Sequence, residues 1–126
     1  MQLLKFEDHV AGGDDAAVLT IANDVDPRTL SLDGVRRIDL NFPKFTDGRA
    51  YSQAYMLRRR LNYAGEIRAT GDVLIDQLVQ MHRSGITTAV LRQGLDTHAA
   101  QRQFDRYNAF YQGDAVETQP HFLQAA

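Results

Sequence analysis

A short stretch near the middle of the chain combines side chains that suit anion binding. Its members are Lys44, Thr46, Asp47, Gly48 and Arg49. Asp47 is a typical first residue of a helix, because its carboxylate can accept hydrogen bonds from the free backbone N–H groups there. Backbone N–H groups at a helix start attract anions, and the lysine and arginine would add positive charge. The stretch therefore predicts a pocket for a small anion or a phosphate-bearing cofactor.

A structural explanation of the same residues stands beside the functional one. Asp47 could simply cap the helix, and Phe42 and Phe45 could belong to the core. Lys44 and Arg49 would then be solvated surface charges. The residue types alone leave both explanations open.

The elements around this stretch predict an α/β fold. Short β-branched or alternating apolar segments at 17–22, 37–42, 66–70 and 87–91 are typical of strands. Helical spacing of apolar residues follows Asp47, Asp72 and Asp96, and Pro27 suits the first position of a shorter helical turn. Alternating strands and helices favour a parallel sheet with right-handed crossovers. We expect about four parallel strands in a small open sheet or half of a β/α-barrel. Gly65 is the expected left-handed residue that ends the first helix, and Ser84-Gly85 is expected to end the second.

The 126 residues are expected to form a single domain. Residues 1–16 are expected to be an N-terminal arm or strand, and residues 113–126 a C-terminal tail. Ligands of parallel sheets bind outside the carboxyl ends of the strands. Further candidates at those ends are Ser52, Arg68, Gly71, Asp72 and Arg92. Arg68 joins them only if the alternation along its strand points its side chain toward the site. Asp72 is in the first place the expected N-cap of the second helix.

Composition excludes several kinds of chemistry. The sequence has no cysteine, which excludes disulfides, thiol nucleophiles and thiolate-bound metals or clusters on this chain. Neither the dinucleotide-binding nor the P-loop glycine pattern occurs. The four histidines are scattered, so no metal site is expected, and His82 is expected to pack against an apolar face. No catalytic residue can be named, and the cofactor stays unknown.

Charge and hydropathy point away from nucleic acid and membranes as partners. The net charge is −2, and the three successive arginines at 58–60 are expected to form a solvated side of a helix. No apolar run approaches the roughly 20 residues of a membrane-spanning helix. Acidic residues near the start do not suit a signal peptide. We therefore expect a cytoplasmic protein.

The central segment also resembles a known bacterial family. The string from Phe42 to Ala54, F-P-K-F-T-D-G-R-A-Y-S-Q-A, is similar to the signature of the family called domain of unknown function 934. The segments G-E-I-R-A-T-G-D-V-L at 65–74 and R-S-G at 83–85 continue the resemblance, which spans about 19–111. Members are described as candidate oxidoreductases, and their genes commonly lie beside those for sulfite reductase. The resemblance implies a role in sulfite reduction or cysteine biosynthesis, with no established active site.

Three functional hypotheses follow. The chain could be an accessory protein or oxidoreductase subunit of assimilatory sulfite reduction that uses the anion pocket. It could instead be a non-catalytic binding or scaffold partner of sulfite reductase or of another sulfur-assimilation enzyme. It could also be a sensor of a small ligand. A short parallel sheet exposes strand edges, so we also expect a homo-oligomer.

Overall fold

The fold is a five-stranded, all-parallel open sheet with helices between its strands, seen in a computed structural model that describes residues 1–44 and 48–111. The strand order is β1-β5-β4-β3-β2. The strands are β1 (Gln2–Leu4), β2 (Val18–Ile21), β3 (Arg37–Phe42), β4 (Glu66–Gly71) and β5 (Thr88–Val90). The prediction of an α/β open sheet is confirmed, and the N-terminal segment supplies a fifth strand. Residues 113–126, expected to be a tail, lie outside the described residues.

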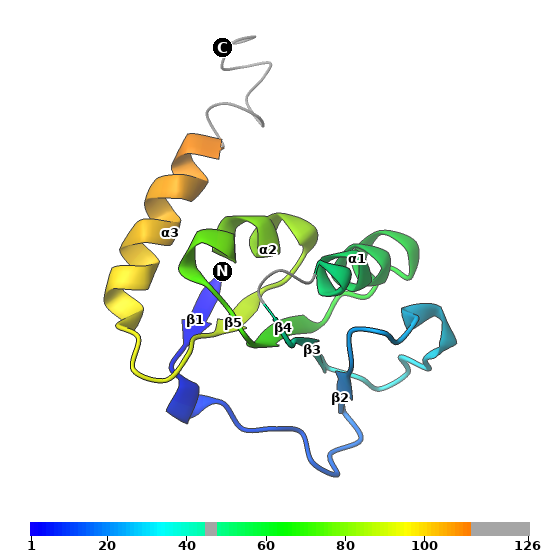
Figure 1. The fold of residues 1–126 in the computed structure, drawn as a ribbon. Coiled ribbons are helices and arrows are strands. Elements are labelled where there is room, and N and C mark those ends of the chain that lie inside the picture. Colours follow the sequence, from blue (N-terminus) through cyan, green and yellow to red (C-terminus); the bar gives the residue numbers. More distant parts are fainter. Residues whose placement is uncertain (45–47, 112–126) are drawn as a thin grey trace, which may run out of the picture.

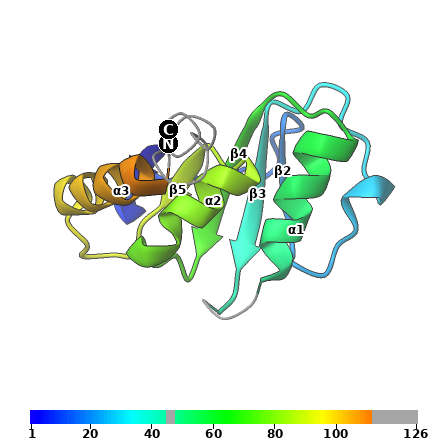
Figure 2. The same cartoon turned by 90° about the horizontal axis from the view of Figure 1, so that it is seen from above.

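The helices gather on one side of the sheet. They are α1 (Arg49–Tyr55), α2 (Leu78–Ser84) and α3 (Thr97–Tyr111). Helices α1 and α2 lie over one face of the sheet, and α3 packs against α2 and β1 (Figures 1 and 2). The segment between β1 and β2 crosses the opposite face (Figure 1). Parallel strands need such crossover connections, because each strand must start again at the same end of the sheet.

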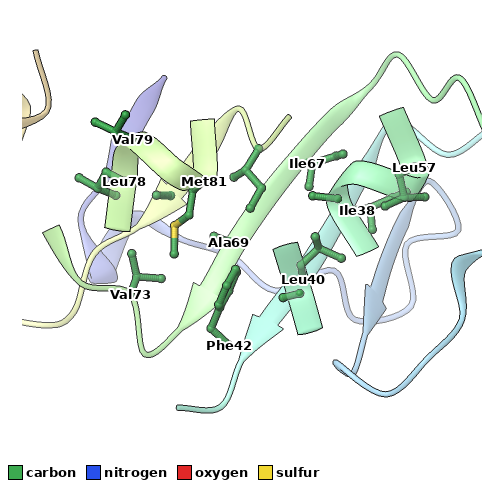
Figure 3. Close-up of a cluster of buried hydrophobic side chains, with 14 of the residues drawn as sticks. Ile38, Leu40, Phe42, Leu57, Ile67, Ala69, Val73, Leu78, Val79 and Met81 are labelled. Carbon is green, nitrogen blue, oxygen red and sulfur yellow. The ribbon is translucent and has the colours of Figure 1, made fainter. Parts of the chain in front are cut away.

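The core lies between the sheet and the helix layer. Ile38, Leu40 and Phe42 alternate along β3, are fully buried and point toward the helices (Figure 3). Leu57, Leu78 and Met81 reach them from the helix layer, and all three are fully buried. Arg37, Asp39 and Asn41 face the opposite side, and the first two are nearly as buried.

The first helix ends differently from the prediction. After Tyr55 the helix widens into a π-turn, Met56–Arg60, in which the Leu61 N–H donates to the Met56 carbonyl. Asn62, with φ 54°, is the left-handed residue that ends it, so the prediction that Gly65 plays this part is wrong. Asparagine tolerates this conformation better than most residues. With the π-turn, the helix ends at Asn62, before the expected Gly65. Asp47, the expected cap, lies outside the described residues.

The start of the second helix is also displaced. A 3₁₀ turn, Ile75–Gln77, precedes α2, and its N-cap is Leu74. The prediction that Asp72 caps this helix is therefore wrong, because the chain stays extended through Leu74 before it turns. The other end is as predicted: Gly85, with φ 105°, closes α2. Pro27 occupies the first position of a short 3₁₀ helix, Pro27–Thr29, as expected.

Of the three successive arginines at 58–60, Arg58 connects parts of the fold through hydrogen bonds. Arg58 donates to the carbonyls of Tyr63 (2.8 Å), Gly65 (2.7 Å) and Gly85 (2.9 Å). It thereby ties the end of the first helix to the start of β4 and to the end of α2. Arg59 and Arg60 are exposed, as predicted, and Arg59 lies over the Tyr55 ring at 5.0 Å.

Edge strands and membrane spans bear on two further expectations. β2 is an edge strand, and no strand of the described residues pairs with its outer side. Self-association through such an edge stays a prediction.

Among the residues that the structure describes, no helix is both long and apolar enough to cross a bilayer.

We predict that Arg58→Ala destabilises the fold by about 2–4 kcal/mol, because three carbonyl groups lose a charged donor. The matched variant Arg59→Ala removes only a ring contact and should cost less than about 1 kcal/mol. Urea unfolding of both variants measures the difference. Equal losses would show that the three hydrogen bonds do not hold the layers together.

Candidate functional site

The carboxyl ends of the strands meet at one edge of the sheet, as the parallel topology requires. The segments that leave this edge are 22–24 after β2, 43–44 after β3, 72–73 after β4 and 91–94 after β5. The segments after β2, β3, β4 and β5 therefore all begin in the region where parallel sheets bind ligands. The predicted site residues separate into three groups at this edge and beyond it.

The first group is a cavity between α1 and the loop that follows β2, which we call the loop–helix cavity. Its volume is about 360 Å³. Arg49 and Ser52 of α1, both predicted, line it. The loop contributes Asn23, Asp24, Val25, Asp26, Pro27 and Arg28, and the helix adds Gln53 and Met56. The cavity thus brings basic, hydroxyl and acidic groups together with a few apolar side chains.

The loop is held in place by a buried glutamine. Gln53 is only 5% exposed, and its Nε2 donates to the carbonyls of Ala22 and Val25, each at 2.8 Å. The prediction overlooked this residue. Its signal was a polar side chain three positions after Ala50 and four before Leu57, on the apolar face of the helix. A polar residue on a buried face must find hydrogen-bond partners, and here the loop supplies them.

The cavity contains one internally neutralised ion pair. Arg28 Nη2 lies 2.8 Å from Asp26 Oδ2, and its Nε lies 3.1 Å from Asp26 Oδ1. Asp26 also accepts from the Arg28 backbone N–H at 3.0 Å, which caps the short 3₁₀ helix. Hydrogen bonds from Arg28 keep the pKa of Asp26 below its ordinary value. Arg49 is a second cation in the lining of this cavity, and the carboxylate of Asp24 opposes the attraction of an anion.

The second group lies at the exits of β4 and β5. Arg92 Nη1 is 3.6 Å from Asp72 Oδ1, so the structure brings these two predicted residues together as a surface ion pair. Gly71 precedes the pair with φ 95°, and the Asp72 N–H donates to the Phe42 carbonyl at 2.7 Å. Asp72, which was expected to cap a helix, instead forms an ion pair between the exits of β4 and β5.

The remaining predicted residues lie apart from both groups. Lys44 and Gly48 are exposed on either side of residues 45–47. Thr46 and Asp47 fall outside the described residues. Arg68 is in the first half of β4, on the face opposite the helices, where its Nη2 pairs with Glu66 Oε2 at 2.9 Å. The structure therefore does not bring Arg68 to the strand exits.

Histidines and acidic residues do not gather into a metal site in the described part of the chain, where no group of three or more could hold an ion. His82 packs edge-on against the Phe104 ring at 5.6 Å between centroids, as the prediction of a packed histidine requires. Burial lowers its pKa.

A protein-family model matches most of the chain. The family model described as "bacterial protein of unknown function (DUF934)" matches residues 17–122. The chain belongs to the DUF934 family. Searches of curated proteins and of solved structures found no match.

The stretch that matches DUF934 begins immediately before β2. It takes in β2 to β5, all three helices, the loop–helix cavity and the Asp72–Arg92 pair. β1 and most of the segment that crosses the second face of the sheet precede it.

We predict that Gly71→Ala destabilises this DUF934 member by about 2–5 kcal/mol, from a left-handed backbone plus steric overlap. A Cβ there would lie 2.5 Å from the Phe42 carbonyl oxygen. Gly94→Ala is the matched control, since Gly94 has φ 88° but nothing within 4 Å of an added Cβ, and it should cost about 1–2 kcal/mol. Thermal or urea unfolding measures both. If the two variants lose equal stability, the close packing of the β3 and β4 exits contributes nothing.

Proposed function

We propose that this protein serves assimilatory sulfite reduction or cysteine biosynthesis as an accessory protein or oxidoreductase subunit. In this role it binds a small oxyanion or phosphate-bearing ligand in the loop–helix cavity. The observation that carries the ligand proposal is that Arg49 and Ser52 line one cavity at the carboxyl edge of the parallel sheet. The link to sulfur metabolism is supported by the resemblance of the F-P-K-F-T-D-G-R string, in which Arg49 is the last residue.

The chemistry of the cavity suits recognition of an oxyanion. A guanidinium group donates hydrogen bonds in a planar fork that matches sulfate, sulfite or phosphate oxygens. The Ser52 hydroxyl can add a third donor one turn further along the helix. The apolar atoms of Val25 and Met56 provide space for an uncharged part of the ligand. Because the sequence has no cysteine, redox chemistry by this chain would use a bound cofactor or a partner protein.

We predict that Arg49→Ala weakens binding of sulfite, sulfate or phosphate by about tenfold or more, because a hydrogen-bonded charge pair with the ligand is lost. Asp24→Asn should strengthen binding severalfold at low ionic strength, because it removes a repelling carboxylate. Isothermal titration calorimetry with these anions and with free flavin measures the affinities. Arg59→Ala, on the same helix but outside the cavity, is the control and should bind like the parent.

Two results would count against the cavity. Unchanged affinity in Arg49→Ala would exclude it as the anion site. Loss of binding in Lys44→Ala, with Arg49→Ala unaffected, would place the site at the exit of β3 instead. Turnover of sulfite by the purified protein, or a bound chromophore, would favour an enzyme over a sensor that uses the same cavity.

A second candidate function, binding to sulfite reductase or another sulfur-assimilation enzyme without catalysis, is favoured by the outer surface of α2. Two hollows of about 330 and 280 Å³ share Val79 and Gln80. Tyr55 lines the first hollow and is 50% exposed, and Tyr107 lines the second and is 41% exposed. Exposed tyrosines beside a groove are enriched at the centres of protein interfaces.

We predict that the double variant Tyr55→Ala/Tyr107→Ala loses most of its co-purification with sulfite reductase under mild lysis, by about tenfold, since each anchor contributes about 1 kcal/mol or more. Phe6→Ala is the control, because Phe6 is 52% exposed but lies on the segment that follows β1. Quantitative immunoblotting at matched expression measures the recovered enzyme. Equal recovery by parent, control and double variant would exclude the α2 surface as the docking site.

A further inference from the structure

Within residues 1–44 and 48–111, one segment crosses the face of the sheet opposite α1 and α2: residues 5–17, which we call the strap. It leaves β1 at one edge of the sheet and enters β2 at the other (Figure 1). On β3 the side chains beneath it are charged, because the alternation that points Ile38 and Leu40 toward the helices points Arg37 and Asp39 the other way. The strap therefore covers charged groups.

Few apolar contacts hold the strap. Phe6 is 52% exposed and Val10 is 73% exposed. At its far end Gly12 packs closely against Val18, and Asp15 forms an exposed ion pair with Arg36 at 2.8 Å. A segment with so little buried apolar surface has low local stability, so its polar contacts decide whether it stays docked.

The central contact requires a neutral histidine. His9 Nδ1 lies 3.0 Å from Arg68 Nη1. Because a guanidinium can only donate, Nδ1 must accept, and the ring proton must be on Nε2. The neighbouring Val10 carbonyl accepts from Arg37 Nη2 at 2.8 Å. Arg37 and Arg68, on this face of the sheet, thus each donate a hydrogen bond to an acceptor on the strap.

The charges around His9 balance only while the ring is neutral. From β4, Arg68 pairs with Glu66 at 2.9 Å, and from β3, Arg37 pairs with Asp39, also at 2.9 Å. These two pairs hold two positive and two negative charges, and a proton on His9 Nδ1 would add an unbalanced positive charge. It would also make Nδ1 a donor, which cannot accept the hydrogen bond from Arg68. Burial and the two arginines lower the pKa of His9, while Asp39 and Glu66 partly oppose them.

We propose that the strap is a pH-sensitive cover: it is docked on the sheet through neutral His9, and protonation of His9 releases it while the sheet and helices stay folded. The direction follows from linkage. Free His9 binds a proton more readily than docked His9, so docking is strongest above pH 6.5. It weakens as the pH falls from 6.5 to the lower pKa of the docked form, and it changes no further below that pKa. The ratio of released to docked strap should rise by up to tenfold per pH unit in that window.

The absence of cysteine makes a direct test simple. Ala11 is exposed on the strap, so Ala11→Cys accepts one nitroxide spin label at a single site. Electron paramagnetic resonance between pH 7.5 and 5.0 should show a change from slow to fast label motion below pH 6.5. Circular dichroism recorded in parallel should show that the helices are retained. Histidine NMR should place the neutral ring proton on Nε2.

Two further variants test the assignment to His9. His9→Gln keeps a side-chain acceptor for Arg68 but does not titrate, so its label should stay slow throughout. His82→Gln removes a second histidine whose pKa is lowered, and its label should change as in the parent. Any one of four outcomes would overturn the proposal: no change in the parent, the same change in His9→Gln, fast motion in His9→Gln at every pH, or loss of the helices at the same pH as the change.

Discussion

The rest of the structure depends on the parallel register of β3 against β4. Ile38 pairs with Ile67 and Leu40 with Ala69, so both strands direct fully buried apolar side chains toward the helices. The same register places Arg37 opposite Glu66 and Asp39 opposite Arg68 on the other face. One alternation therefore creates an apolar face, which needs helices, and a charged face, which needs acceptors and counter-charges. A register shifted by one residue would exchange the two faces.

Each face recruits a different kind of cover. On the apolar face, Leu57, Leu78 and Met81 pack onto the strands, and Arg58 ties the helix ends to β4. On the charged face, opposite charges pair within each strand, and the strap supplies His9 and a backbone carbonyl. Parallel sheets are usually apolar on both faces, because helices cover both. The polar second face here explains how a thin, exposed strap can take the place of a second helix layer.

The parallel direction of the strands also determines where the candidate site lies. Strand exits meet at one edge, and there Gln53 anchors the loop after β2 to α1. That anchor shapes the loop–helix cavity and places Arg49 and Ser52 beside the loop. At the neighbouring exits, Gly71 packs closely against the Phe42 carbonyl of β3, and Asp72 pairs with Arg92, which follows β5. The site is thus a consequence of how loops leave the sheet rather than of one motif.

The sequence by itself determined the class of fold, because alternation and helical spacing are local properties that neighbouring residues encode. The strands after Ala17, the three helices, the role of Pro27 and the end of α2 at Gly85 could all be predicted in this way. Arg49 and Ser52 were also identified as candidates for one site. The tertiary structure decided what depends on distant partners: the π-turn that ends the first helix at Asn62, the pairing of Asp72 with Arg92, and the burial of Gln53. It also decided the face of Arg68, because the direction of an alternating side chain has no meaning until the sheet has a helix side and a strap side.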